Sequence, residues 1–266
     1  KEPALRGVVS GIGKDDAVVV WSGGIYDWFD PLTLIQAMAK LSEKRPSVRL
    51  FFMGTAHPHP GVPEMPIIAK ARQLAKDLGV ADKNVFFNDS WVDYGKRADY
   101  LLEADVGVST HRSHIETTFS FRTRILDYLW ARLPMVLTEG DHFADLVASR
   151  GLGIAVPAGD VNALVEALEK ALFDEKAREK YRAALDLSRE EYRWSRVLGP
   201  LVEHIDALAS GGIKKTTSRP VRFSPSRPRP PRFSIRDIGR GFERLFRGEF
   251  RSLVRAVSRK LRPRRS

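Results

Sequence analysis

Six short apolar runs, separated by longer helical patterns, constrain the fold of this chain more than any other feature of its sequence. The runs are Ala17–Trp21, Val48–Met53, Asn84–Phe87, Asp105–Val108, Pro134–Leu137 and Gly153–Val156. Each run is continuous and rich in β-branched or aromatic residues, as parallel strands covered on both faces are. The predicted fold class is therefore α/β, with the six strands in a doubly wound parallel sheet.

Helical patterns with recognisable ends fill the intervals between these runs. They cover Leu32–Leu41, Pro63–Leu78, Lys96–Glu103, Phe121–Arg132, His142–Ser149, Val161–Leu172 and Lys176–Glu191. Asp30 and Pro31 predict an N-cap and a first-turn proline for the first helix. Gly79 is expected just past the end of the second, because glycine adopts the left-handed conformation found there without strain.

The positive charge of the chain is concentrated near its C-terminal end. The 266 residues carry a formal net charge of +11, yet residues 211–266 hold 18 Lys and Arg against 3 Asp and Glu, a net charge of +15. Residues 1–210 hold 26 basic against 30 acidic groups, a net charge of −4. We therefore predict a folded α/β domain over 1–210, a flexible Pro- and Arg-rich linker over 211–232, and a basic amphipathic helix over 233–266.

The final segment combines an apolar stripe with a row of arginines. Apolar residues recur at three- and four-residue steps at Ile235, Ile238, Phe242, Leu245, Phe246, Phe250, Leu253, Val254, Val257 and Leu261, with arginines on the other side. This pattern is typical of a helix in the interface of an anionic membrane, so we predict membrane contact through residues 233–262. Nucleic-acid binding through the surplus charge, and a solvated extension without function, are the alternatives.

Composition and termini exclude several classes. Without cysteine the chain has no disulfide, no thiolate metal site and no Cys nucleophile. No apolar run approaches the ~20 residues that cross a bilayer. The chain opens with Lys-Glu-Pro and no apolar segment, so we expect a processed chain or an excised fragment. Neither His57-Pro58-His59-Pro60 nor the group His111, His114 and Glu116 has its ligands spaced along one helix face, and no metal site is predicted.

Three loops follow the carboxyl ends of predicted strands, where open parallel sheets bind their ligands. In the first, Ser22–Trp28, Gly23 and Gly24 allow a ligand to approach the backbone, and two aromatic side chains offer surfaces for stacking. A tight turn with the tryptophan packed on the core is the alternative. The third loop, Thr138–Asp141, favours a structural role, because its last residue is a natural N-cap.

The second loop, Ser109–Arg124, carries the most chemistry. Ser120 is predicted to cap a helix that starts at Phe121, whose first unpaired N–H groups would form an anion site. Arg122 and Arg124 add the fixed positive charge that a diphosphate needs. A solvated helix start with ordinary surface arginines is the alternative.

The run Thr118–Leu137 connects these residues to a known family. It resembles the signature of family 4 retaining glycosyltransferases of the GT-B fold, in which a basic, phosphate-binding helix start is followed by a carboxylate and a Gly-x-Pro stretch. The preceding Leu101–Ser109 is similar to the strand before that signature. By this resemblance Arg124 is the basic residue, and Asp127 is the carboxylate that holds the nucleotide ribose.

The resemblance implies the Rossmann-like C-terminal half of a GT-B enzyme, which binds a nucleotide-sugar donor and acts with retention and without a metal or other cofactor. Glu116 resembles the family's first Glu, which faces the donor sugar, and is the implied catalytic residue. Eleven residues separate it from Asp127, against eight in the family. Donor binding is implied for Gly23, Gly24, Ser120, Phe121, Arg122, Arg124 and Asp127.

Three departures from the family pattern carry expectations of their own. No Lys or Arg lies between Ser22 and Ala39, where the family holds the diphosphate, so the arginines of the second loop are expected to supply that charge. Arg132 stands where the family has Gly, which would alter that turn. The acceptor-binding N-terminal half is missing, so we expect a partner domain.

The predicted membrane contact implies what kind of acceptor the protein uses and where in the cell it lies. We expect a lipid-linked or surface-glycan acceptor, and a cytoplasmic protein peripheral on the inner face of a membrane. A non-catalytic binding module of the same fold is the alternative.

Overall fold

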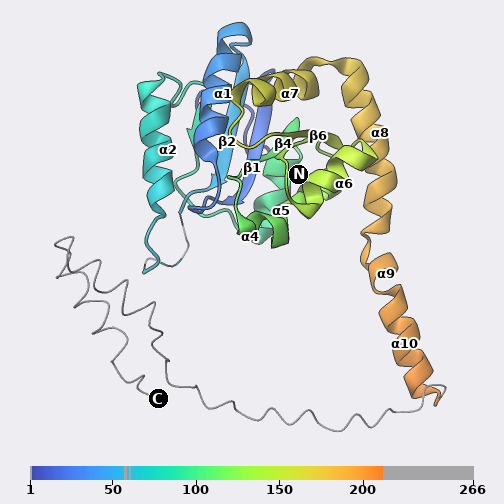
Figure 1. The fold of residues 1–266 in the computed structure, drawn as a ribbon. Helices are drawn as coiled ribbons and strands as arrows, with labels where there is room; N and C mark the ends of the chain where they lie inside the picture. The colour runs from blue at the N-terminus through green and yellow to red at the C-terminus, as the bar shows by residue number, and fades with distance from the viewer. Residues whose placement is uncertain (1, 57–58, 60, 212–266) are drawn as a thin grey trace, which may run out of the picture. The chain divides into compact units, whose positions relative to one another are not determined.

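The computed structural model describes residues 2–56, 59 and 61–211 (Figure 1). The predicted amphipathic helix at 233–266 and nearly all of the predicted linker lie outside the described residues, as do His57, Pro58 and Pro60. None of the described helices is long and apolar enough to cross a membrane.

Six parallel strands form one sheet in the order β3-β2-β1-β4-β5-β6. The strands are β1 (Ala17–Gly24), β2 (Val48–Gly54), β3 (Val85–Phe87), β4 (Val106–Ser109), β5 (Met135–Thr138) and β6 (Gly153–Val156). The chain builds outward from β1 through β2 to β3, and then returns to place β4 on the other side of β1. The predicted doubly wound sheet is confirmed, and every predicted strand is present within a few residues.

Helices cover both faces of the sheet (Figure 1). They are α1 (Pro31–Lys44), α2 (Pro66–Asp77), α3 (Arg97–Leu101), α4 (Ile115–Phe119), α5 (Arg124–Ala131), α6 (His142–Arg150), α7 (Val161–Phe173), α8 (Glu175–Glu191), α9 (Trp194–Val197) and α10 (Gly199–Ala209), with a 3-10 turn, η1 (Tyr94–Lys96), before α3. Apolar side chains of α1, α2 and α7 share one core cluster, and those of α3, α5, α6 and α8 share another.

Successive strand residues divide between these two clusters, because side chains of a strand point alternately to its two faces. Val19 and Trp21 of β1 belong to the first cluster, whereas Val18 and Val20 belong to the second. All four side chains are fully buried. This double burial explains why the strands are continuously apolar in sequence.

The helix ends follow the predicted chemistry in most places. Asp30 caps α1 by accepting a hydrogen bond from the Thr33 backbone N–H at 3.1 Å. Gly79, at φ +67°, follows Leu78, the C-cap residue of α2. Asp141 caps α6, as expected for the third loop, by accepting from the Ala144 N–H at 2.8 Å.

The predicted capping role of Ser120 is wrong. Residues Ile115–Phe119 form the short helix α4, and Ser120 ends it in an extended conformation, with its own backbone N–H bonded to the Thr117 carbonyl. The next helix, α5, begins only at Arg124. Ser120 therefore lies too far ahead of α5 to accept from its first N–H groups.

The Tyr128 side chain joins the carboxyl ends of β1 and β4. Its hydroxyl accepts a hydrogen bond from the Ser22 N–H at 2.9 Å and lies 2.9 Å from the Val108 carbonyl oxygen. Its ring lies against Gly107, where a Cβ atom would sit 2.5 Å from the ring. Burial raises the pKa of the Tyr128 phenol, which keeps the hydroxyl protonated as a donor. The Tyr128 side chain thus links the two strands just before the loops that follow them.

Candidate functional site

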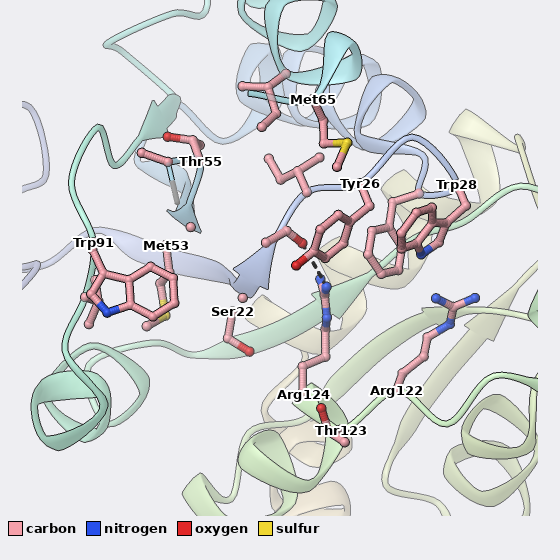
Figure 2. Close-up of a pocket in the computed structure, with 18 of the residues that line it drawn as sticks. Ser22, Tyr26, Trp28, Met53, Thr55, Met65, Trp91, Arg122, Thr123 and Arg124 are labelled. Carbon is pink, nitrogen blue, oxygen red and sulfur yellow. Dashed lines mark hydrogen bonds between the residues drawn. The ribbon is translucent and has the colours of Figure 1, made fainter. Parts of the chain in front are cut away.

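A cavity of about 590 Å³ opens beyond the carboxyl ends of β1, β2 and β3 (Figure 2). The loops after these three strands line it together with the segment Glu116–Asp127. All of the predicted site residues are among its walls: Gly23, Gly24, Glu116, Ser120, Phe121, Arg122, Arg124 and Asp127. The fold therefore brings together two loops that are about a hundred residues apart in sequence.

Arg124 is the central cation of the cavity. Its guanidinium lies over the rings of Trp21 and Phe29, with its central carbon 4.7 Å and 4.3 Å from the ring centroids. One terminal nitrogen, Nη2, donates to the Gly24 carbonyl oxygen at 2.9 Å, the bond drawn in Figure 2. Within the described part of the chain, no hydrogen-bond acceptor reaches the other terminal nitrogen, Nη1, which is buried.

The electrostatic state of Arg124 suits it to bind an anion. Burial lowers the pKa of its guanidinium to about 10, and the neighbouring positive charge of Arg122 acts in the same direction. At neutral pH the group still carries its full charge. A buried, charged donor with an unmet hydrogen bond is costly unless a ligand supplies the acceptor.

Arg122 forms ion pairs with two carboxylates of the protein. Its Nε donates to Asp141 Oδ2 at 2.9 Å, and its Nη2 lies 3.4 Å from Glu116 Oε2. Arg122 and Asp141 are both buried, whereas the Glu116 side chain is 40% exposed. The diphosphate-binding role of Arg122 stays a prediction, and in the structure its guanidinium holds the Glu116 carboxylate at the cavity wall.

Asp141 stands at the centre of this buried group. The Nε2 atom of His111 lies 3.6 Å from Asp141 Oδ2, and neither residue lines the cavity. Burial alone would raise the pKa of Asp141, but interactions with His111, the Ala144 N–H and Arg122 bring it below its ordinary value. The ionised carboxylate is thus the stable form at neutral pH, and it fixes Arg122.

Asp127, the predicted ribose ligand, is paired with a residue that the sequence does not single out. Its Oδ2 lies 3.0 Å from Nη1 of Arg97, and its side chain is 22% exposed to the cavity. Burial raises the pKa of Asp127, against the charges of Arg97 and Arg124. Arg97 gives no sequence signal, because it lies in a short helix thirty residues before Asp127.

The first loop brings backbone and rings to the cavity. Gly23 has φ +82°, a left-handed conformation that glycine adopts without strain, and a Cβ atom there would lie 3.8 Å from Arg124 Nη2. Tyr26 and Trp28 stack on each other and remain partly exposed. The alternative of a tryptophan packed on the core is therefore wrong, because Phe29 fills that place instead.

A second aromatic group lies at the other side of the cavity. Trp91 and Tyr94, which follow β3, are 54% and 79% exposed, and both line the cavity. In Figure 2 Trp91 lies to the left of Ser22 and Arg124, and the Tyr26–Trp28 pair lies above and to the right of them. The cavity thus has a cation in its middle and aromatic rings on both sides.

One family model matches more than half of the chain. The sequence model described as "Glycosyl transferases group 1" matches residues 16–174. The chain is 32% identical over 95 residues to the phosphatidyl-myo-inositol mannosyltransferase of Mycobacterium leprae (strain TN), a match that covers 36% of this chain and 25% of that protein. The matched region thus spans only a quarter of the curated relative.

Solved structures share the fold at low sequence identity. The C-terminal domain of a glycosyl transferase group 1 family protein (LpcC) from Francisella tularensis superposes with a TM-score of 0.54 at 17% identity, covering 67% of this chain and 87% of that one. Anabaena Alr3699/HepE in complex with UDP-glucose superposes with a TM-score of 0.58 at 16% identity, covering 74% and 50%.

Proposed function

Because the chain belongs to the glycosyl transferases group 1 family, we propose that its cavity binds a nucleotide-sugar donor and that the chain is the donor-binding half of a glycosyltransferase. The observation that carries this proposal is Arg124, a half-buried cation whose buried Nη1 donor is unmet among the described residues, beside the Gly23–Gly24 backbone. A diphosphate has the charge and the acceptor oxygens that this group lacks. The UDP-glucose complex of the Anabaena protein with the same fold supports the choice of ligand class.

The cavity arrangement fits the parts of such a donor. The diphosphate lies on Arg124 and on the backbone of the first loop, and the Asp127 carboxylate accepts hydrogen bonds from the ribose. Glu116, held by Arg122, faces the donor sugar. In the transfer step the bond between the anomeric carbon and the diphosphate oxygen breaks, a bond to an acceptor oxygen forms, and the acceptor proton leaves with the nucleoside diphosphate. Arg124 stabilises the charge that develops on the departing diphosphate.

The proposal also covers the stereochemistry of sugar transfer and the class of acceptor. The sugar is transferred with retention at the anomeric carbon and without a metal ion, and the acceptor is a lipid-linked or surface glycan. A second domain closes the open side of the cavity, because positioning the acceptor and excluding water need an opposite wall. The basic, apolar-striped sequence of residues 233–262 supports attachment to an anionic membrane, with the enzyme on its cytoplasmic face.

Titration calorimetry of the chain with UDP-, GDP- and dTDP-sugars tests donor binding. We expect saturable binding of at least one of them, and Arg124→Lys should weaken it by roughly tenfold or more, because lysine keeps the charge but loses the planar pair of donors. Arg45→Lys is the matched control, since Arg45 pairs with Glu169 outside this cavity. If no nucleotide sugar binds the folded chain, the proposed function is wrong.

A non-catalytic nucleotide-binding module is the second candidate. The pairing of Arg122 with Asp141 and Glu116 favours it, because it leaves Arg124 as the main cation for the diphosphate. Donor turnover distinguishes the two. For an enzyme, adding the N-terminal half should raise the rate at which nucleoside diphosphate is released in the presence of acceptor, whereas for a module that rate stays at background.

A further inference from the structure

The stacked pair formed by Tyr26 and Trp28 is not explained by packing alone. The two ring centroids lie 4.7 Å apart and the ring planes differ by 7°. The residues are 38% and 43% exposed, although Phe29 beside them is buried and contacts both rings at 6.1 Å between centroids. Two large aromatic rings thus line the cavity and stay partly exposed instead of joining the core.

The loop that carries these rings is held in place. Asp27, between them, accepts a hydrogen bond from the backbone N–H of Ile67 at 3.1 Å, near the first turn of α2. The Tyr26 ring also packs against the Gly24 backbone, where a Cβ atom would lie 3.1 Å from it. A surface fixed on both sides loses little freedom when a ligand covers it.

The position of the Tyr26–Trp28 pair indicates what kind of ligand could bind against it. It adjoins Gly24, whose carbonyl oxygen accepts from Arg124, so it lies next to the proposed diphosphate site. Trp91 lies on the opposite side of Arg124 in Figure 2. A nucleotide sugar has one ring system on each side of its diphosphate, and so two aromatic surfaces flanking one cation match its order of parts.

A pyranose ring is the chemistry that suits this surface. One face of such a ring consists of C–H groups, which are apolar and slightly positive, and it meets the negative face of an aromatic ring favourably. The hydroxyl groups at the ring edge then reach polar partners, and Glu116 and Arg122 line the same cavity. We propose that Tyr26 and Trp28 form a saccharide-stacking platform that takes a pyranose ring of the substrate, an inference that rests on the proposed function.

The ring has two possible sources, the donor sugar and a sugar of the acceptor. For the donor arm, UDP, GDP and dTDP are titrated first alone and then as their hexose conjugates. The gain in affinity from the sugar should fall about fivefold in Trp28→Ala and be largely kept in Trp28→Phe. The affinity for the bare nucleotide should stay within about twofold. Trp130→Ala is the matched control, because Trp130 is 53% exposed on α5 and does not line the cavity.

For the acceptor arm, methyl glucoside, mannoside and galactoside are added to the chain with and without saturating nucleoside diphosphate. Saturation-transfer NMR should detect their ring protons on the wild-type chain and lose them in Trp28→Ala. A sugar effect in the donor arm assigns the platform to the donor, and one in this arm alone assigns it to the acceptor. Far-UV circular dichroism checks that each variant is folded.

The outcomes separate this proposal from the proposed function. If no nucleotide binds, the donor-binding function fails, and the glycosides added to the unliganded chain still decide on the platform. A different result would overturn the platform. In that result nucleotides bind, Trp28→Ala leaves the gain in affinity from the sugar unchanged, and no glycoside signal depends on Trp28.

Discussion

Asp141 performs two tasks with its two carboxylate oxygens. Oδ1 caps α6 through the Ala144 N–H, while Oδ2 holds Arg122. Asp160 caps α7 in the same way, accepting from the Ala163 N–H at 2.9 Å, and it forms no ion pair within the described residues. The chain therefore contains a natural control in which the cap is present without the buried ion pair.

Replacement of each aspartate by asparagine separates the two tasks. Asn caps a helix about as well as Asp, so Asp160→Asn should change the free energy of unfolding by less than about 0.5 kcal/mol. Asp141→Asn leaves the buried Arg122 without its principal partner and should cost about 3 kcal/mol. Urea denaturation of both variants measures this difference. Equal costs would mean that the ion pair does not stabilise the fold.

The cost at Asp141 should also depend on pH. Because the folded-state pKa of Asp141 lies below its unfolded value, its contribution is fully present above that unfolded value and is lost as pH falls through the folded one. The stability difference between wild type and Asp141→Asn should therefore be constant from pH 7 to about 5 and should shrink below about pH 4. Denaturation at a series of pH values tests this trend, and a difference that grows in acid would contradict it.

At the scale of residues, the sequence predicts which side chains line the cavity better than it predicts their partners. Arg122 and Arg124 are equivalent in the sequence pattern. Their different roles arise from partners far along the chain, Asp141 for one and the Gly24 carbonyl for the other. No local spacing encodes such contacts, so burial and pairing of each arginine become visible only in the folded chain.

At the scale of elements, the strands were predictable because double burial leaves a continuous apolar run. The short helix α4 was not, because a run of five residues with two threonines gives no helical period, and Ile115 and Phe119 at its ends are mostly exposed. Its presence delays α5 to Arg124. Neither α9 nor α10 is among the predicted helices, and many of their apolar residues are exposed.

The end of α5 shows how a helix terminus keeps its geometry without glycine. Arg132 ends α5 at φ +60° and ψ +32°, and its guanidinium pairs with Asp186 of α8. The expected alteration of this turn is therefore not seen, since the backbone adopts the left-handed conformation that glycine favours. A non-glycine residue in that region costs about 1 kcal/mol or more.

Arg132→Gly should relieve this cost. In an Asp186→Ala background, where the ion pair is already absent, we expect it to raise the melting temperature by about 2–4 °C in differential scanning calorimetry. Without that background the gain should be smaller, because the exposed pair contributes up to ~1 kcal/mol. A lower melting temperature for Arg132→Gly in the Asp186→Ala background would show that the turn is not strained.

At the scale of the whole molecule, the acidic domain and the basic extension are predicted to have separate tasks. Removal of residues 211–266 takes away a net charge of +15, whereas the described residues that line the cavity all lie between Ser22 and Asp127. The truncated chain should therefore bind nucleotide sugars as the full chain does but should no longer sediment with vesicles of anionic phospholipid. Neutral vesicles are the control. Undiminished sedimentation after truncation would place membrane contact elsewhere, and sedimentation with RNA instead would favour the nucleic-acid alternative.

The close packing of Gly107 against Tyr128 limits which substitutions these two positions can accept during evolution. A methyl group at position 107 would meet the Tyr128 ring at 2.5 Å, while loss of the phenol hydroxyl would leave the Ser22 N–H without its acceptor. Either substitution alone is expected to destabilise the domain, and a paired change that shrinks Tyr128 to make room at position 107 would restore the volume but not the hydrogen bond. Descendants of this sequence are therefore expected to keep both residues, so that this pair constrains the evolutionary paths open to the domain.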